Sequence, residues 1–232
     1  RSPAEIAQAR EAGRLAARVL HMITPHVQPG VSTEALDRLC HDYIVNELQV
    51  TPANVGYLGY PKTVCTSVNH VICHGIPSPG QVLKAGDIIN IDVAIIKDGW
   101  FGDTSRMYFV GEPSPLARRL VGTTYEAMCA GIAQVRPGAT LGDVGHAIQS
   151  VAHRERFSVV REYCGHGIGQ VYHDEPQVLH YGQRGHGLRL EEGMVFTIEP
   201  MINAGKRDTQ ELADGWTCLL YTSPSPRDAT LS

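Results

Sequence analysis

The chain has 232 residues, of which 43% are hydrophobic and 19% are charged, and its formal net charge is −4. This composition is ordinary for a globular protein and excludes a general attraction to nucleic acid or to an anionic membrane surface. No apolar run reaches the roughly 18 residues that a membrane span needs. The six cysteines form no CxxC pair, so we expect reduced thiols in an intracellular protein of the cytoplasm.

The first segment, residues 3–24, has the apolar spacing of an amphipathic helix and differs from a signal peptide. Because the first residue is not Met, we expect a processed or trimmed chain. Ser32 or Thr33 is predicted to cap a second helix that runs to about Leu48. Residues 54–76 are rich in strand and turn residues.

Helical spacing returns over residues 115–135 and stops at a Pro-Gly pair. It restarts behind Thr140, and Asp143 stands where a capping box places its acid. Strands and loops are predicted over residues 156–217.

Two segments resemble each other, "VQPGVSTEALD" at 27–37 and "VRPGATLGDVG" at 135–145. Each follows a helix, opens another, and precedes a β segment with Cys and His, "VICHGIP" or "EYCGHGIG". Such helix–turn–helix segments can look alike by chance. The other interpretation is a duplicated α+β unit with a pseudo-twofold axis, in which a site would draw ligands from both halves.

The segment "IINIDVAIIKDGWFGDTSRMYFV" predicts a β-hairpin that turns at Asp98-Gly99. That turn places Asp92 opposite Ser105, so Asp103 lies one diagonal away on the same face, with Cβ atoms about 7 Å apart. An isolated acid in an apolar strand is costly, and two adjacent carboxylates repel unless a proton or a metal ion lies between them. A solvent-facing acid plus a turn acid is the alternative, but the apolar neighbours of Asp92 speak against it.

Further side chains that could bind a metal ion follow along the chain. Glu199 is the single acid in "GMVFTIEPMI", which reads as an apolar strand, and His74 lies in "VICHGIP". A lone His is more often structural than a ligand. Carboxylates with one imidazole suit Mn, Fe, Co or Zn in paired sites, where ions about 3.5–4 Å apart activate a shared water.

The stretch "CGHGIGQVYHDEP" contains His166 and His173 among glycines. It lacks the GxGxxG pattern and the Gly-Lys-Ser/Thr ending of phosphate-binding loops, and the chain has no GxSxG elbow. A thiol protease that uses Cys164 beside His166 is conceivable but leaves the acids unexplained. On an uninterrupted strand the two histidines would point to opposite faces, so we expect a bulge or turn at the glycines.

Four segments together resemble the type I methionine aminopeptidases: "YPKTVCTSVNHVICHGIP", "INIDVAIIKDGWFGDTSRMY", "CGHGIGQVYHDEPQV" and "EEGMVFTIEPMINAGKRDTQELADGWT". The resemblance covers residues 3–217. It implies an α+β pita-bread fold, with two pseudo-twofold-related halves around a central antiparallel sheet. It also implies that residues 1–217 form one catalytic domain and that the protein is a monomer. The implied activity is removal of the N-terminal Met from nascent proteins, and it would need two divalent metal ions (Co, Mn, Fe or Zn).

The resemblance implies a role for each matching residue. The catalytic residues are His74, which contacts the substrate, His173, which stabilises the tetrahedral intermediate, and Glu199, a proton shuttle. The metal ligands are Asp92, Asp103 (bridging both ions), His166 and Glu199. The pocket for the methionine side chain is lined by Tyr57, Tyr60, Cys65, Tyr172 and Trp216, with Tyr172 where bacterial members often have Phe.

The tail, residues 218–232, departs from the family. Family members continue into two more strands, of which the first carries a fifth ligand, a Glu that bridges both ions. The expected position falls on Thr230, and the nearest acid is Asp228. We expect a foreign sequence, artefactual or disordered, with no strand pattern after Thr217. We also expect impaired metal affinity, activity and stability.

Two other functions remain open. Proline-specific aminopeptidases share the fold and a similar ligand set. Pita-bread proteins that lack metal serve as binding modules, although this chain keeps four of the family's five ligands. The resemblance is compatible with association with the ribosome and implies neither a nucleic-acid specificity nor a membrane partner.

Overall fold

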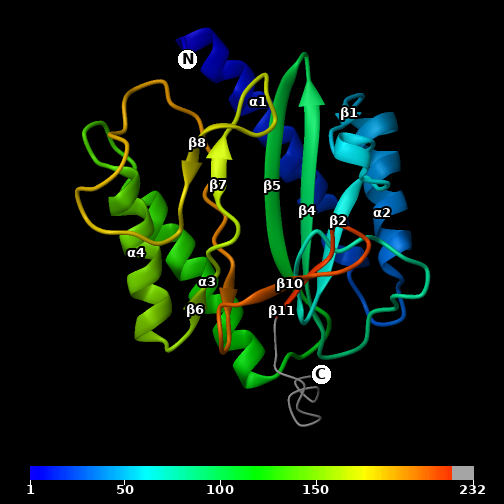
Figure 1. Ribbon diagram of the computed structural model, residues 1–232. Coiled ribbons are helices and arrows are strands. Elements are labelled where there is room, and N and C mark those ends of the chain that lie inside the picture. Colours follow the sequence, from blue (N-terminus) through cyan, green and yellow to red (C-terminus); the bar gives the residue numbers. More distant parts are fainter. Residues whose placement is uncertain (221–232) are drawn as a thin grey trace. The chain divides into compact units, whose positions relative to one another are not determined.

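The computed structural model describes residues 1–220 and divides them into two compact units (Figure 1). The N-terminal unit holds residues 7–114 and 210–219, and the C-terminal unit holds 1–6, 115–209 and 220. Each unit combines helices with antiparallel strands, which confirms the α+β class. Most of the tail, including Asp228 and Thr230, lies outside the described residues.

The N-terminal unit is built on two helices and a hairpin. Its helices are α1 (Pro3–Ile23, in this unit from Ala7 on) and α2 (Thr33–Asp42), the latter continued by a π-helical turn (Tyr43–Glu47). Its strands are β1 (Thr51–Pro52), β2 (Val64–Val68), β3 (Val71–Cys73), β4 (Ile88–Lys97), β5 (Trp100–Phe109), β10 (Thr209–Glu211, in this unit from Gln210 on) and β11 (Cys218–Leu220, in this unit up to Leu219). The two predicted helices are confirmed, and the Ser32 hydroxyl caps α2 by accepting the Ala35 N–H at 3.2 Å.

Strand β4 is the centre of a four-stranded sheet. The long strand β5 pairs with one edge of β4, and β1 and β2 pair with the other edge, all antiparallel. Alternate residues of β4 (Ile89, Ile91, Val93 and Ile95) are fully buried in one core cluster with side chains of α1 and α2. The other face of β4 therefore carries the polar side chains Asn90 and Asp92.

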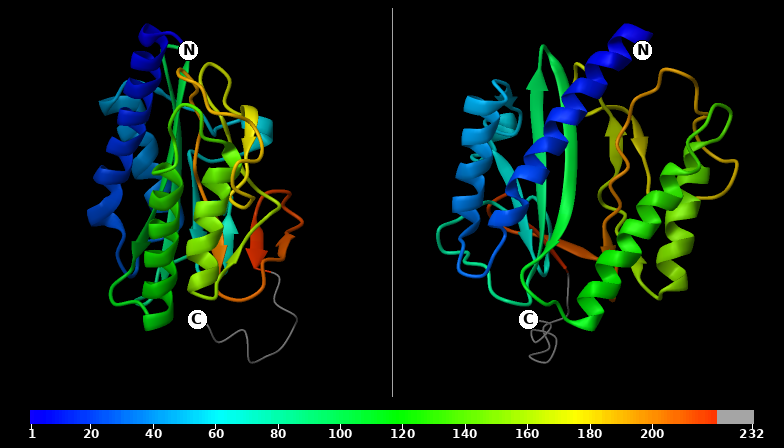
Figure 2. Two further views of the ribbon diagram at one scale, coloured as in Figure 1. Left: turned by 90° about the vertical axis from the view of Figure 1, so that its left-hand side faces the viewer. Right: turned by 180° about the vertical axis from the view of Figure 1, so that it is seen from behind.

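Helix α1 lies directly against the hairpin (Figure 2). A Cβ atom at Gly102 of β5 would collide with the backbone of Ala12 and Gly13 in α1, so glycine is required at this close approach. The turn at Asp98-Gly99 has positive φ at both residues (50° and 81°), as two-residue hairpins with right-handed twist need. The predicted hairpin is thus confirmed.

The end of the N-terminal unit contains a three-stranded sheet, in the order β10-β11-β3. Strand β11 pairs antiparallel with β3, with Cys218 opposite Cys73. The expectation that no strand follows Thr217 is therefore wrong for Cys218–Leu220. Backbone pairing with β3 imposes strand structure there although the local sequence shows no alternating pattern.

The C-terminal unit contains α3 (Pro115–Ile132), α4 (Leu141–Arg154), β6 (Ser158–Val159), β7 (Gly165–Gly167), β8 (Asp174–Val178) and β9 (Ile202–Asn203). Strand β6 pairs with β9, and β7 pairs with β8. Helices α3 and α4 pack closely, since Gly131 leaves room for the side chain of Ile148. The predicted capping box is present: Thr140 and Asp143 each accept the other's backbone N–H, at 3.2 Å and 2.8 Å.

Across the described part of the chain, no helix combines the length and apolar character that crossing a membrane requires.

Candidate active site

Asp92 and Asp103 lie on the same face of the β4–β5 hairpin. The register places Asp92 opposite Ser105 and Asp103 opposite Ala94, so the two acids are diagonal neighbours across the ladder. Asp92 is half-buried and points away from the α1–α2 face. The geometry predicted from the Asp98-Gly99 turn is confirmed.

Cys65 is the neighbour of Asp92 on its other side, since β2 pairs these two residues directly. Burial, and after it the charge of Asp92, raises the pKa of the Cys65 thiol, which therefore stays protonated. Tyr60 is also buried, and its hydroxyl donates to the carbonyl oxygen of Val64 (3.0 Å) or of Gly75 (3.2 Å). Burial raises the pKa of Tyr60 as well. Both side chains are thus uncharged at neutral pH.

Trp216 contacts two of the residues that are predicted to bind the substrate. Its ring meets Tyr60 edge-on at a centroid distance of 5.0 Å and His74 at 6.1 Å. Asp214 fixes the turn before it by accepting the Trp216 backbone N–H at 2.9 Å. Tyr57 lies half-buried in a short 3-10 turn just before Tyr60. Within the N-terminal unit, the chain therefore brings Tyr60, His74 and Trp216 together.

His74 follows β3 in a left-handed backbone conformation, with φ of 55°. Such a conformation costs free energy in a residue with a β-carbon and is common at functional sites. The ring is half-buried, and this burial lowers its pKa, although the charges of Glu211 and Asp103 act in the opposite direction. His74 is thus largely neutral at pH 7 and can accept or donate a hydrogen bond.

The glycine-rich segment contains the expected bulge. The register between β7 and β8 shifts between His166 and Gly167, and His173 lies in the bend just before β8. The His166 and His173 rings lie beside each other, with centroids 4.3 Å apart. The buried Tyr172 ring stacks on His173 at 4.2 Å. The bulge therefore turns both imidazoles toward the same region.

Two glycines of this segment make room for neighbouring backbone. A Cβ atom at Gly165 would collide with the carbonyl of Thr197, and one at Gly167 would collide with the carbonyl of Glu175. Glycine is therefore required at both positions, because any side chain would displace the neighbouring backbone.

Glu199 lies in an irregular segment, which corrects the expectation of a strand there. The segment forms a bridge between Phe196 and Gly167 and a few backbone hydrogen bonds to the β7 region, but no strand among the described residues. Pro200 follows directly and has no N–H to extend a ladder. The Glu199 carboxylate nevertheless lies close to His166, with Oε1 3.4 Å from Nε2.

Two residues that the sequence did not single out hold Glu199. The Thr197 hydroxyl donates to Glu199 Oε1 at 2.5 Å, and Nε2 of His180 accepts the Glu199 backbone N–H at 3.1 Å. His180 is 2% exposed, and burial lowers its pKa to about 4, so the ring is neutral and can accept. The alternation Thr197–Glu199 in "FTIEP" was the available signal for Thr197, whereas nothing local identifies His180.

His166 and Glu199 form a donor set that suits a divalent metal ion. The Nδ1 atom of His166 donates to the Gly167 carbonyl at 3.0 Å, so in the neutral ring Nε2 carries a lone pair. That lone pair lies 3.4 Å from a carboxylate oxygen, an arrangement that a shared cation or proton stabilises. A backbone carbonyl on the far imidazole nitrogen is the usual partner of a metal-binding histidine.

The thiol-protease alternative is not supported by Cys164. Burial, followed by the charge of Glu199, raises the pKa of its thiol. A nucleophilic cysteine needs the opposite shift, toward the thiolate.

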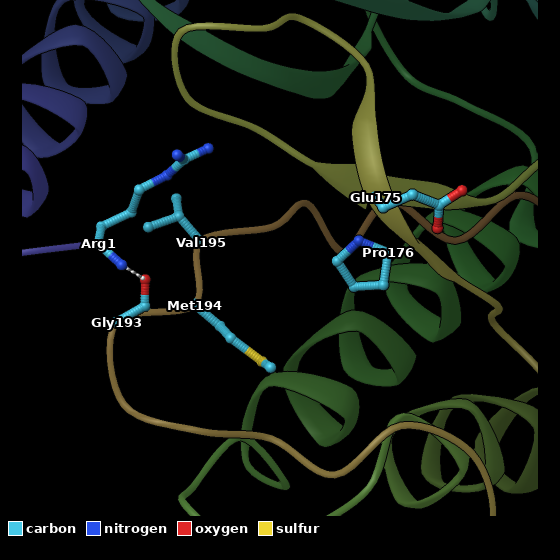
Figure 3. A pocket seen from close by; sticks show the side chains of 6 residues that line it. All are labelled: Arg1, Glu175, Pro176, Gly193, Met194 and Val195. Carbon is cyan, nitrogen blue, oxygen red and sulfur yellow. Dashed lines mark hydrogen bonds between the residues drawn. The ribbon is translucent and has the colours of Figure 1, made fainter.

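One pocket of the C-terminal unit is lined by other residues than those described above (Figure 3). It has a volume of about 230 Å³ and is lined by Arg1, Glu175, Pro176, Gly193, Met194 and Val195. The amino group of Arg1 donates to the Gly193 carbonyl at 2.8 Å at its edge. None of its lining residues is a predicted site residue.

Comparison with known proteins identifies the family of this chain. Residues 7–218 match the metallopeptidase family M24. A methionine aminopeptidase of Escherichia coli K12 is 55% identical over 217 residues, which is 94% of this chain and 82% of that protein. One from Rickettsia prowazekii is 55% identical over 224 residues, which is 96% of this chain and 83% of that protein.

Solved structures agree. A crystal structure of methionine aminopeptidase from Rickettsia prowazekii has a TM-score of 0.92 at 54% identity and covers 94% of this chain and 88% of that one. The enzyme from Thermotoga maritima has a TM-score of 0.91 at 37% identity, with the same coverage. An X-Pro aminopeptidase of Thermotoga maritima shares the fold alone, with a TM-score of 0.70 at 20% identity over 86% of this chain and 54% of that one. The expected pita-bread fold is confirmed, and the chain belongs to metallopeptidase family M24 and, within it, to the methionine aminopeptidases.

Proposed function

We propose that this protein is a metal-dependent aminopeptidase that removes the N-terminal methionine of peptides and nascent proteins. The observation that carries the proposal is the facing pair His166 Nε2 and Glu199 Oε1, 3.4 Å apart, in a chain 55% identical to methionine aminopeptidases. The neutral wall around Tyr60 and Cys65 supports an apolar first residue of the substrate.

The metal ligands in this proposal are Asp92, Asp103, His166 and Glu199, which would hold two divalent ions (Co, Mn, Fe or Zn). The diagonal placement of Asp92 and Asp103 supports this assignment, because two adjacent carboxylates favour a cation between them. The lone pair on His166 Nε2 supports it too. When bound, such ions supply Lewis acidity and a water of lowered pKa.

The protein's own groups then have separate roles. His173 donates a hydrogen bond to the carbonyl oxygen of the first peptide bond and stabilises the charge that develops there. Tyr172 supports this role because its stacked ring limits the rotation of His173. His74 contacts the substrate beside the scissile bond. Glu199 carries a proton from water to the leaving amine.

Aromatic and thiol side chains bind the side chain of the substrate's first residue. The apolar character of this binding surface matches a methionine side chain. Residues in this role are Tyr57, Tyr60, Cys65, Tyr172 and Trp216. The edge-on contact of Tyr60 with Trp216 supports a shaped apolar wall. We further propose that residues 1–217 act as one catalytic domain, to whose sheet β11 adds Cys218–Leu220, and that the protein works as a monomer in the cytoplasm on chains leaving the ribosome.

The test compares three peptides with the chain loaded with Mn²⁺. We expect hydrolysis of Met-Ala-Ser, no hydrolysis of acetyl-Met-Ala-Ser, and little hydrolysis of Ala-Pro-Ser. The same preparation of His166→Ala serves as the control for contaminating host peptidases. Preference for Ala-Pro-Ser would support a proline-specific enzyme instead. Absence of hydrolysis together with absence of Mn²⁺ binding would favour the binding-module alternative.

A further inference from the structure

The Thr197 hydroxyl connects the two residues of the C-terminal unit that we assign as metal ligands. Its oxygen accepts the backbone N–H of His166 at 3.0 Å, and it lies 2.5 Å from Glu199 Oε1. The Thr197 backbone N–H in turn donates to the His166 carbonyl at 2.8 Å. Thr197 thus contacts His166 through both its backbone and its side chain.

The direction of these hydrogen bonds follows from their donors. A backbone N–H can only donate, so the Thr197 oxygen is the acceptor toward His166. The hydroxyl has one proton, which is left for Glu199, and a carboxylate can only accept. The short distance is typical of an O–H bond to a charged oxygen. The orientation of this hydroxyl is therefore determined by its surroundings.

Two of the contacts that Glu199 makes have different consequences. His180 accepts its backbone N–H at 3.1 Å and fixes the main chain, whereas Thr197 binds a carboxylate oxygen and fixes the side chain. Loss of the Thr197 hydroxyl would remove one contact of the carboxylate while the hydrogen bond from the backbone N–H to His180 stays. A hydrogen bond to one oxygen also determines where the other oxygen points, because the carboxylate is planar.

We propose that Thr197 is a positioning residue, whose hydroxyl orients the Glu199 carboxylate toward Nε2 of His166 and so preorganises both for a divalent metal ion. The inference rests on the proposed function, in which His166 and Glu199 are ligands. Groups that orient metal ligands typically contribute about 10–100-fold to metal affinity.

The test uses Thr197→Val, which removes the hydroxyl but keeps the branched shape, and Thr197→Ser, which keeps the hydroxyl. Mn²⁺ is titrated calorimetrically into metal-free protein. We expect the dissociation constant to rise about 10–100-fold in Thr197→Val and to be largely restored in Thr197→Ser. The visible absorption of bound Co²⁺ should change in the Val variant and stay unchanged in the Ser variant.

A matched control is Thr66→Val. The Thr66 hydroxyl is buried on β2 and has no hydrogen-bond partner among the described residues, so its loss should leave Mn²⁺ affinity unchanged. The melting temperature of the metal-free protein is measured for every variant. We expect Thr197→Val to lower the melting temperature modestly, because the His166 backbone N–H loses its acceptor, and Thr197→Ser to melt like the unmodified chain. A large drop there would assign the hydroxyl to folding and overturn the inference.

Two further outcomes distinguish a failure of the positioning role from a failure of the proposed function. If the unmodified chain binds Mn²⁺ and Thr197→Val binds equally well, the positioning role is wrong while the proposed function stands. If the unmodified chain binds no Mn²⁺, the proposed function fails and the inference fails with it.

Discussion

The imidazole rings of His166 and His173 lie with their centroids 4.3 Å apart and their planes inclined by 54°. On a regular strand these two residues would face opposite sides. The register shift after His166, and the bend that carries His173, remove this conflict. One imidazole is thereby available for a metal ion and its neighbour for the substrate, which is the division of roles that we propose.

His173→Ala should lower kcat by about 10²–10³ with little change in KM, because a hydrogen-bond donor to the developing oxyanion acts mainly in the transition state. Steady-state kinetics with Met-Ala-Ser measure this. His153→Ala is the control, since His153 is exposed in the last turn of α4. A rise in KM at constant kcat would instead assign His173 to ground-state binding.

His166→Ala should raise the dissociation constant of Mn²⁺. The increase should exceed the factor of about 10–100 that is typical when a group that only orients a metal ligand is lost. The reason is that the substitution removes the Nε2 lone pair beside Glu199. Calorimetric titration checks the affinity. In parallel, EDTA should abolish hydrolysis by the unmodified chain and added Mn²⁺ should restore it. Full activity after complete removal of metal would contradict the proposal.

Gly167→Ala should destabilise the protein by about 1–3 kcal/mol, the usual cost of overpacking a well-packed site. The added methyl group would meet the Glu175 backbone, which cannot move aside as a flexible side chain could. Gly122→Ala in α3 is the matched control, because nothing lies near its added Cβ atom. It should stabilise the helix by about 0.5–1 kcal/mol. Urea unfolding measures the free energy of unfolding of both variants. Equal changes in the two variants would refute the steric explanation.

Asp143→Asn should destabilise the protein at neutral pH and have less effect in acid. Hydrogen bonds from the backbone N–H groups of Thr140 and Gly185 lower the pKa of Asp143 from its usual 3.8. A carboxyl group with a lowered folded-state pKa stabilises the fold above its unfolded pKa, and this contribution is lost as the pH falls through the folded value.

The measurement is the difference in urea midpoint between Asp143→Asn and the unmodified chain at about pH 7 and about pH 3. The difference should shrink at the lower pH. Asp208→Asn, at an exposed position outside the helices, is the control and should show no such trend. A difference that persists undiminished in acid would exclude the charge of Asp143 as its cause.

Local features were predictable from the sequence because their causes are local. The Asp98-Gly99 turn sets the hairpin register, and the period-two alternation of a strand then places Asp92 and Asp103 on one face. The capping box of α4 follows likewise from Thr140 and Asp143, which lie within one helical turn. The requirement for a bulge near His166 followed from strand geometry alone.

Only the tertiary structure decided the environment of Glu199. Residues distant in sequence supply its contacts, since His180 and His166 come from separate segments and converge through packing of the C-terminal unit. The same holds for β11, where hydrogen bonds to β3 impose a strand on a segment without a strand pattern. The sequence by itself thus determined which side chains can carry the chemistry, through short-range periodicity and turn geometry. Long-range hydrogen bonds and burial, which no local pattern encodes, decided how those side chains are oriented.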